Sequence, residues 1–293
     1  MIGTYANLVP FSYSLASIFN NWFFSLDGAF WILVLGMMAV VLISYLARQL
    51  TLKGSLAAFF VGLGTTWILG FGALGCLLLF FLAAGVLGAI ARTHKAKDLA
   101  SMQKKGGCRD ALQVFANGGM ALFCALLYAF SPSMIVLVMF GGAIAEAASD
   151  TFAGEVGILS RTKPVSIITR KPMQPGLSGA ISPLGSMAGV LGSLLIALCW
   201  LGNFLPVTGK NFGYASVMAL GGFSGCILDS FLGATVQAHY LDEDTNTLTE
   251  HPFLHGKQLS LVRGIRWIDN DMVNLISNIF GSLLAGALAL TIG

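Results

Sequence analysis

Residues 133–150 read SMIVLVMFGGAIAEAASD, an apolar run of 18 residues in which only Glu146 and Asp150 carry charge. A helix rises about 1.5 Å per residue, so a run of this length nearly crosses the roughly 30 Å hydrocarbon core of a membrane. Comparable runs occupy 28–47, 55–72, 73–91, 111–130, 133–150, 177–201, 213–238 and 272–292. The sequence therefore predicts an all-α polytopic membrane protein with about eight transmembrane helices, forming a single domain over residues 1–293.

The composition excludes an ordinary soluble domain. Only 10% of the 293 residues are charged, 56% are hydrophobic and the mean hydropathy is +0.81. The five cysteines are scattered and never form a C-x-x-C pair, which favours packing over a disulfide framework or a zinc site. The stretch before Leu26 contains no Lys or Arg, so it lacks the basic start of a signal peptide and is compatible with a short interfacial helix.

Basic residues are distributed very unevenly among the connections between the predicted spans. One side holds Arg48, Lys53, Arg92, Lys95, Lys97, Lys104, Lys105, Arg109, Arg161, Lys163, Arg170, Lys171, Lys257, Arg263 and Arg266. The other side holds only Lys210. The positive-inside rule then places both termini outside and segments 48–54, 92–110, 151–176 and 239–271 in the cytoplasm.

This topology predicts a protein of a bacterial or archaeal inner (cytoplasmic) membrane whose active face is cytoplasmic. Segment 92–110 is strongly basic and is expected to lie along anionic lipid head groups. Segment 239–271 alternates polar and apolar residues around turn formers, which predicts a small hairpin that forms a cytoplasmic loop or lid.

Three acidic residues lie within predicted spans. Glu146 and Asp150 are four residues apart and so share one face of a helix, and Asp229 lies in the seventh span. A carboxylate in a membrane helix costs at least about 2.5 kcal/mol, so such residues usually face a protein interior or a water-filled cavity and have a partner. We predict that all three bind a metal ion; structural pairing with Arg or Lys is the alternative.

Two short patterns repeat at predicted helix ends. DTFAG at 150–154 matches DSFLG at 229–233, and DALQVFAN at 110–117 matches DMVNLISN at 271–278. In the second pair, positions i, i+3 and i+7 form one stripe of a helix, which directs a carboxylate and two amides the same way. The spacing predicts four polar helix ends around one cavity. An internal duplication stays open, because matches this short are weak.

Carboxylates and carboxamides without a His or Cys cluster suit a hard divalent cation such as Mg²⁺, which commonly binds together with phosphates. Cations for those phosphates come from SRTKPVSIITRKPMQPGLSGAIS at 160–182 and from Lys53, just before the second span. The same segment is expected to start a helix at Gly176–Gly179, where free N–H groups and the helix dipole favour a phosphate. Together these features predict phosphoryl chemistry.

Five runs resemble successive blocks of one integral-membrane family. They are GGCRDALQVFANGG (106–119), AEAASDTFAGEVGILS (145–160), ITRKPMQPGLSGAISPLGS (168–186), GFSGCILDSFLGATVQ (222–237) and WIDNDMVNLISNIFG (267–281). The family includes the chloroplast phytyl-phosphate kinase, animal transmembrane protein nineteen, and bacterial and archaeal members. The blocks follow the family order and cover about residues 50–290. Glu146 departs from the pattern, in which an Ala is expected.

The resemblance implies phosphoryl transfer from a nucleoside triphosphate, with CTP expected, to an isoprenyl monophosphate. By the family blocks, the expected catalytic residues are Arg109, Asp110, Asp150, Asp229 and Lys171. Expected substrate- or nucleotide-binding residues, with Lys53 added from its position, are Gln113, Asn117, Thr151, Glu155, Gly176, Ser178, Gly179, Ser230, Gln237, Asn270, Asn274 and Asn278. Membrane lipid is an expected partner, nucleic acid is not, and a homo-oligomer is possible.

A transporter or flippase of a phosphorylated lipid or small anion is the alternative function. The chain has 36 glycines, which permit close packing and broken spans, and the seventh span could break near Gly221, Gly222 or Gly225. Against this alternative, Asp150 lies about 24 Å of helix rise from Met134 and thus near the inner end of its span. Transport sites are expected nearer the membrane midplane.

Overall fold

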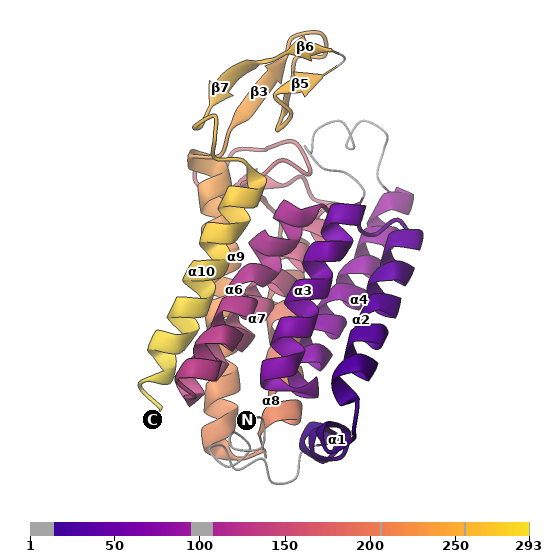
Figure 1. The fold of residues 1–293 in the computed structure, drawn as a ribbon. Coiled ribbons are helices and arrows are strands. Elements are labelled where there is room, and N and C mark those ends of the chain that lie inside the picture. The colour runs from indigo at the N-terminus through magenta and orange to yellow at the C-terminus, as the bar shows by residue number, and fades with distance from the viewer. Residues whose placement is uncertain (1–14, 95–107, 206, 255, 293) are drawn as a thin grey trace.

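In the computed structural model, which describes residues 15–94, 108–205, 207–254 and 256–292, long helices run side by side as one bundle (Figure 1). Eight of them are long and apolar enough to cross a membrane. They are α2 (Ala29–Leu46), α3 (Leu52–Leu69), α4 (Phe71–His94), α6 (Ala111–Phe130), α7 (Met134–Gly157), α8 (Pro183–Phe204), α9 (Gly209–Thr235) and α10 (Asn270–Ala289). The predicted polytopic helical fold is confirmed, whereas its orientation in the membrane stays a prediction.

The short helix α1 (Leu15–Phe24) lies across the end of the bundle opposite the β-strands (Figure 1). The rest of the predicted interfacial segment, residues 1–14, lies outside the described residues. So do residues 95–107, which make up most of the basic segment expected at the lipid head groups.

Helix starts are set by capping side chains rather than by the apolar runs themselves. Ser182 accepts a hydrogen bond from the Gly185 N–H and Pro183 follows it, so α8 begins six residues later than the predicted start of its span. The predicted helix start at Gly176–Gly179 is therefore wrong. Gly176 and Gly179 instead have φ of 82° and 86°, which a helix does not accommodate.

Helix α7 forms the centre of the bundle. Its span is 78% buried, compared with 22% for α2, and it packs against α4, α6, α8, α9 and α10. Glycines of α9 allow this close approach: a Cβ at Gly222 would lie 2.7 Å from the Ala145 Cβ. Helix α9 continues without interruption through Gly221, Gly222 and Gly225, so the predicted break is wrong. These glycines serve packing.

Two groups of short strands complete the fold. Strands β1 (Val165–Ser166) and β2 (Ala180–Ile181) pair between α7 and α8. We call residues 239–263 the β-extension. It contains β3 (His239–Asp242), β4 (Thr247–Thr249), β5 (Phe253–Leu254), β6 (Lys257–Gln258) and β7 (Ser260–Arg263). Its sheet has the order β4-β3-β7 and stands beyond the bundle end where α9 stops and α10 starts (Figure 1).

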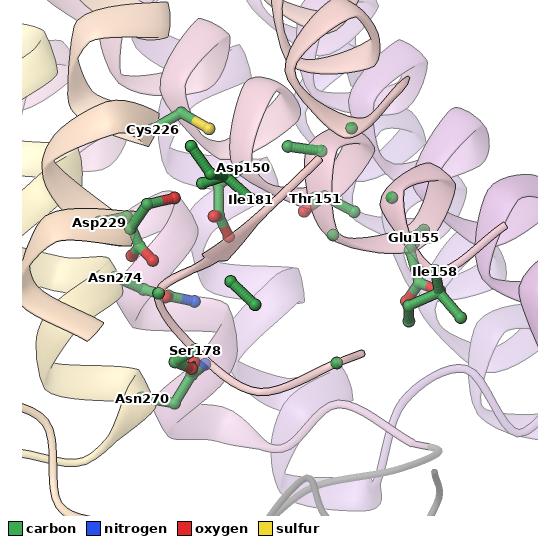
Figure 2. A pocket seen from close by; sticks show the side chains of 18 of the residues that line it. Asp150, Thr151, Glu155, Ile158, Ser178, Ile181, Cys226, Asp229, Asn270 and Asn274 are labelled. Atoms are coloured by element: carbon green, nitrogen blue, oxygen red, sulfur yellow. The ribbon is translucent and has the colours of Figure 1, made fainter. Parts of the chain in front are cut away.

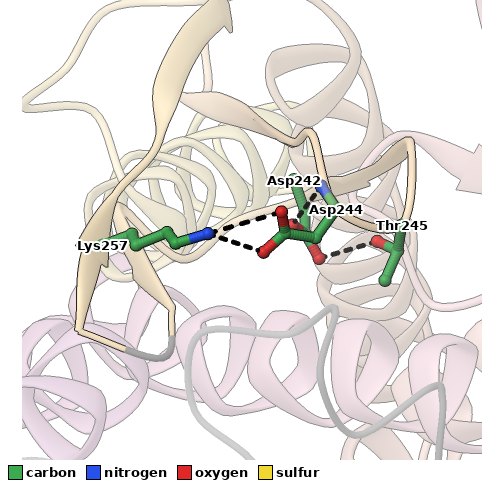
Figure 3. A network of polar contacts seen from close by, with 4 residues as sticks. All are labelled: Asp242, Asp244, Thr245 and Lys257. Carbon is green, nitrogen blue, oxygen red and sulfur yellow. Dashed lines mark hydrogen bonds and ion pairs between the residues drawn. The ribbon is translucent and has the colours of Figure 1, made fainter.

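The turn between β3 and β4 is fixed by a carboxylate (Figure 3). Asp242 accepts hydrogen bonds from the Asp244 N–H at 3.2 Å and the Thr245 hydroxyl at 2.6 Å. Lys257 pairs with Asp244 across 3.1 Å, with both side chains exposed. The predicted hairpin is present; its action as a lid stays a prediction.

Stability of the β-extension is expected to depend on pH through His239. This side chain is fully buried, its Nδ1 lies 3.0 Å from the Gln237 carbonyl, and its Nε2 lies 3.3 Å from the Arg263 guanidinium. Burial, and then the Arg263 charge, lower the His239 pKa from 6.5 to about 4. Between these two pH values the unfolded state binds more protons, so the free energy of unfolding decreases as the pH falls.

Hydrogen exchange measures this effect. Amides of β3 and β7 should exchange faster at pH 5 than at pH 7, once intrinsic exchange rates are corrected. A His239→Gln variant, which cannot titrate in this range, should lose most of that difference. Equal protection of the native protein at both pH values would contradict the prediction.

Candidate functional site

A cavity of about 740 Å³ opens at the bundle end that carries the β-extension. Helices α4, α6, α7, α8, α9 and α10 and the segment between α7 and α8 contribute to its walls. Predicted site residues that line it are Arg109, Gln113, Asn117, Asp150, Thr151, Glu155, Gly176, Ser178, Gly179, Asp229, Ser230, Asn270 and Asn274. The structure thus brings residues from separate sequence blocks to one place, which we call the polar cavity.

Asp150 and Asp229 lie on neighbouring helices and direct their carboxylates into the polar cavity (Figure 2). Asp229 accepts a hydrogen bond from the Asn274 amide at 2.9 Å, whereas the neighbouring Ser277 hydroxyl donates to the Val273 carbonyl, also at 2.9 Å. Asp150 has no hydrogen-bond donor among the described residues, and within that part of the chain neither carboxylate forms an ion pair with Lys or Arg. Two adjacent carboxylates without a cationic partner favour binding of a positive ion.

A single Mg²⁺ held only by protein ligands does not fit this arrangement. Within the described residues, no group of three or more His, Cys, Asp or Glu side chains could hold a metal. Mg²⁺ is, however, usually held by one or two carboxylates together with water and phosphate oxygens. Asp150 and Asp229 therefore fit a Mg²⁺ ion that binds with a phosphorylated substrate.

Two guanidinium groups reach the polar cavity from separate segments. The Arg109 N–H donates to the Gln49 carbonyl at 2.9 Å, and the Thr51 N–H donates to the Arg109 carbonyl at 2.9 Å, which fixes this backbone against the start of α3. Arg170 sits at the end of a tight turn with φ of 57°, and its N–H donates to the Ser166 carbonyl at 3.0 Å. Planar guanidiniums suit phosphate oxygens.

The predicted phosphate loop, residues 176–179, is tied to the β-extension. The Ser178 N–H and hydroxyl both donate to Glu250 Oε1, at 3.0 and 2.5 Å. Gln237 stands behind the loop and donates to the Ser178 hydroxyl at 2.9 Å. The loop is therefore positioned by side chains rather than by a helix start.

Removing the Glu250 carboxylate should loosen this loop. Glu250→Ala would leave two donors of Ser178 without this acceptor, at a cost of about 1–3 kcal/mol for buried groups. We expect a lower thermal unfolding temperature and faster hydrogen exchange in 176–179. Glu250→Gln keeps one acceptor oxygen and should lose less. Equal loss in both variants would argue against this hydrogen-bonding role.

Several predicted residues lie away from the polar cavity. Lys53 and Lys171 are exposed elsewhere, and Gln237 is buried behind the loop. Asp110 caps α6: its carboxylate accepts from the Gln113 N–H, and the Gln113 side chain accepts from the Asp110 N–H, both at 3.1 Å. The predicted catalytic role of Asp110 is therefore not supported by its position.

Equal spacing in the repeated pattern does not give equivalent positions. Asp110 is the capping residue of α6, whereas Asp269 caps α10 and Asp271 is already in its first turn. Asp271 lines the polar cavity, whereas Asp110, its counterpart in the pattern, caps its helix. The two helices begin at different points of the pattern, so the matching aspartates face different ways. The structure gives no support to a duplication with matched helix ends.

Glu146 and Asn278 lie one turn deeper, between α7 and α10. The Asn278 amide donates to the Glu146 carboxylate and to the Ala143 carbonyl, both at 2.8 Å. Glu146 is only 1% exposed and does not line the polar cavity. Its position thus favours packing over the predicted metal binding.

Neither Glu250 nor Asp271 was predicted as a site residue from the sequence, and Lys171 was predicted as a catalytic residue in place of its neighbour Arg170. Glu250 contacts a loop 72 residues earlier in the chain, and no spacing rule links the two. For Asp271 the signal was present, since the repeated pattern included it. The choice between Arg170 and Lys171 depends on a left-handed turn that sequence alone does not reveal.

Comparison with known proteins supports the resemblance. Residues 35–282 match the family described as Integral membrane protein DUF92. The chain is 29% identical to Protein PGR of Arabidopsis thaliana over 82% of this chain and 89% of that protein. An uncharacterized membrane protein of Methanocaldococcus jannaschii is 32% identical, over 81% and 85% of the two chains.

Protein VTE6, chloroplastic, of Arabidopsis thaliana is 26% identical, over 82% of this chain and 65% of that protein. No solved structure matches the chain. The family match covers most of the helical bundle and every segment that lines the polar cavity. The chain therefore belongs to the integral membrane protein DUF92 family.

Proposed function

We propose that this integral membrane protein is a prenyl-phosphate kinase. It transfers the γ-phosphoryl group of a nucleoside triphosphate, with CTP the expected donor, to an isoprenyl monophosphate and so forms the diphosphate. The family resemblance, which includes the chloroplast phytyl-phosphate kinase, supports kinase chemistry. The observation that carries the proposal is one polar cavity at the end of a membrane bundle. It is lined by two guanidiniums and by two carboxylates that have no cationic partner among the residues the structure describes.

The proposed reaction needs no oxidant and no general base. An ionised oxygen of the lipid phosphate attacks the γ-phosphorus, a new P–O bond forms, and the bond to the bridging oxygen breaks. The nucleoside diphosphate leaves with the electron pair. The protein then mainly positions the phosphates and offsets their charge.

Each group of cavity residues has a role in this scheme. Arg109 and Arg170 bind phosphate oxygens, and the amides of Gln113, Asn117 and Asn274 orient the two substrates. Asp150 and Asp229 would hold Mg²⁺, which when bound supplies positive charge to the phosphates.

Two features favour an enzyme over the alternative transporter. Helix α9 is unbroken, whereas transporters typically bind substrate at interrupted helices near the midplane. The polar cavity is lined instead by residues at helix ends and by Glu250 of the β-extension.

Turnover by purified protein tests the proposal. The protein in detergent is incubated with Mg²⁺, a γ-labelled nucleoside triphosphate and geranylgeranyl monophosphate, and labelled diphosphate is separated chromatographically. We expect product with at least one of CTP, ATP, UTP and GTP, and none after chelation of Mg²⁺. Movement of the monophosphate across proteoliposomes without any diphosphate would replace this proposal with the transporter.

A further inference from the structure

A second, smaller cavity of about 120 Å³ lies beside the polar cavity, and we call it the apolar groove. Its walls come from α2, α3, α4 and α6 and consist mainly of side chains such as Val41, Val61, Leu77 and Phe81. Helices α2 and α4 both pack against α3 but hardly against each other, which leaves this space between them. The groove therefore lies within the part of the bundle expected to face hydrocarbon.

The two cavities share part of their walls. Arg109, Gln113, Asn117 and Thr151 line both of them. The groove thus begins where the polar cavity presents a guanidinium, two amides and a hydroxyl. This continuity makes the two cavities one path rather than two separate sites.

Along helix α4, the lining residues change from glycines at the polar cavity to large apolar side chains at the groove. Gly85 and Gly88 line the polar cavity, whereas Leu77 and Phe81 line the groove. The groove-lining stretch of α4, from Leu74 to Phe81, covers about 10 Å of helix rise. Beyond the shared residues, Ser44 supplies a hydroxyl to the wall, and it already donates to the Val40 carbonyl at 2.8 Å.

We propose, on the basis of the proposed function, that the apolar groove binds the hydrocarbon chain of the lipid monophosphate while Arg109, Asn117 and Thr151 contact its phosphate. An amphiphile with an anionic head and an apolar tail matches a path that is polar at one end and apolar at the other. The groove is small, about 120 Å³, so it has room for one hydrocarbon chain but not for two side by side. The preferred substrate is therefore a single-chain lipid phosphate.

Chain-length discrimination tests this assignment. Ala58 lines the groove on α3, and Ala58→Phe would fill it. Leu56→Phe is the matched control, because Leu56 is on the same helix, is 55% exposed and does not line the groove. We expect Ala58→Phe to lower kcat/KM for geranylgeranyl monophosphate by roughly tenfold or more, the effect typical of one misfit in an apolar pocket.

Turnover of dimethylallyl monophosphate, whose five-carbon chain occupies less of the groove, should fall less than that of geranylgeranyl monophosphate in Ala58→Phe. Leu56→Phe should leave both substrates unaffected. Retained short-chain turnover also shows that the variant is folded. Phosphatidic acid, which has two chains, should neither react nor compete. Equal losses for both prenyl substrates in Ala58→Phe and in a second variant, Leu77→Phe, would overturn the groove assignment but leave the kinase intact.

A photoreactive probe separates failure of this inference from failure of the kinase proposal. Geranylgeranyl monophosphate with a diazirine at its distal end should label α2, α3 or α4, and less so in Ala58→Phe. Labelling without any diphosphate formation would reject the kinase while keeping the groove as a lipid-phosphate site. Diphosphate formation with labelling confined to other helices would reject the groove.

Discussion

Replacing Asp229 with Asn is expected to lower phosphoryl transfer by roughly a hundredfold to a thousandfold, the usual effect of removing one preorganised electrostatic group from an active site. Asn has the shape of Asp and keeps an oxygen that can accept from the Asn274 amide, so the bundle should stay folded. Asp150→Asn should lower phosphoryl transfer by a similar factor. The Asp150 carboxylate has no hydrogen bond within the described chain that this substitution would remove. Turnover and thermal unfolding in detergent are measured together.

The double variant gives a sharper result than either single one. If both carboxylates hold one cation, removing the second after the first should cost little more, because residues that act as a unit are strongly non-additive. Asp244→Asn is the control, since Asp244 is exposed in the β3–β4 turn and its partner is Lys257 (Figure 3). Near-normal turnover in both single variants, or losses that multiply, would contradict a shared cation.

Hydropathy was sufficient to predict the eight spans, because a membrane accepts few alternatives to long apolar helices. The acids of DTFAG and DSFLG indicated the polar cavity correctly, since Asp150 and Asp229 both line it. The position of the cavity could be predicted from the sequence because a carboxylate without a cationic partner in a membrane helix needs a polar interior surface beside it.

Other features depend on local geometry that the sequence pattern does not carry. The run 177–182 is apolar enough to resemble the start of a span, yet Ser182 and Pro183 place the helix start after it. Asp110 matched Asp271 in spacing, but the caps set different helix phases. Glu250 reaches Ser178 only because the β-extension folds back onto the bundle.

The loop that Glu250 holds also rests directly on α9, and Gly179→Ala should disrupt this contact. A Cβ at Gly179 would lie 2.6 Å from the backbone N of Ala234 and 2.7 Å from its Cα, so backbone would have to move. Gly179 also has φ of 86°, which costs a residue with a side chain about 1–2 kcal/mol. Overpacking adds about 1–3 kcal/mol.

Gly256→Ala separates these two causes, because Gly256 has φ of 79° but a Cβ added there would have no other atom within 4 Å. The Gly256→Ala variant should have a slightly less stable β-extension and the turnover of the wild-type protein. Gly179→Ala should lose more stability and at least about tenfold in turnover, since a misplaced site costs that much or more. The reason is that Gly179 meets α9 at Gly233, one turn beyond Asp229, so displacing the loop also displaces a carboxylate of the polar cavity. Equal turnover in the two variants would mean that the contact between Gly179 and α9 does not set the geometry of the site.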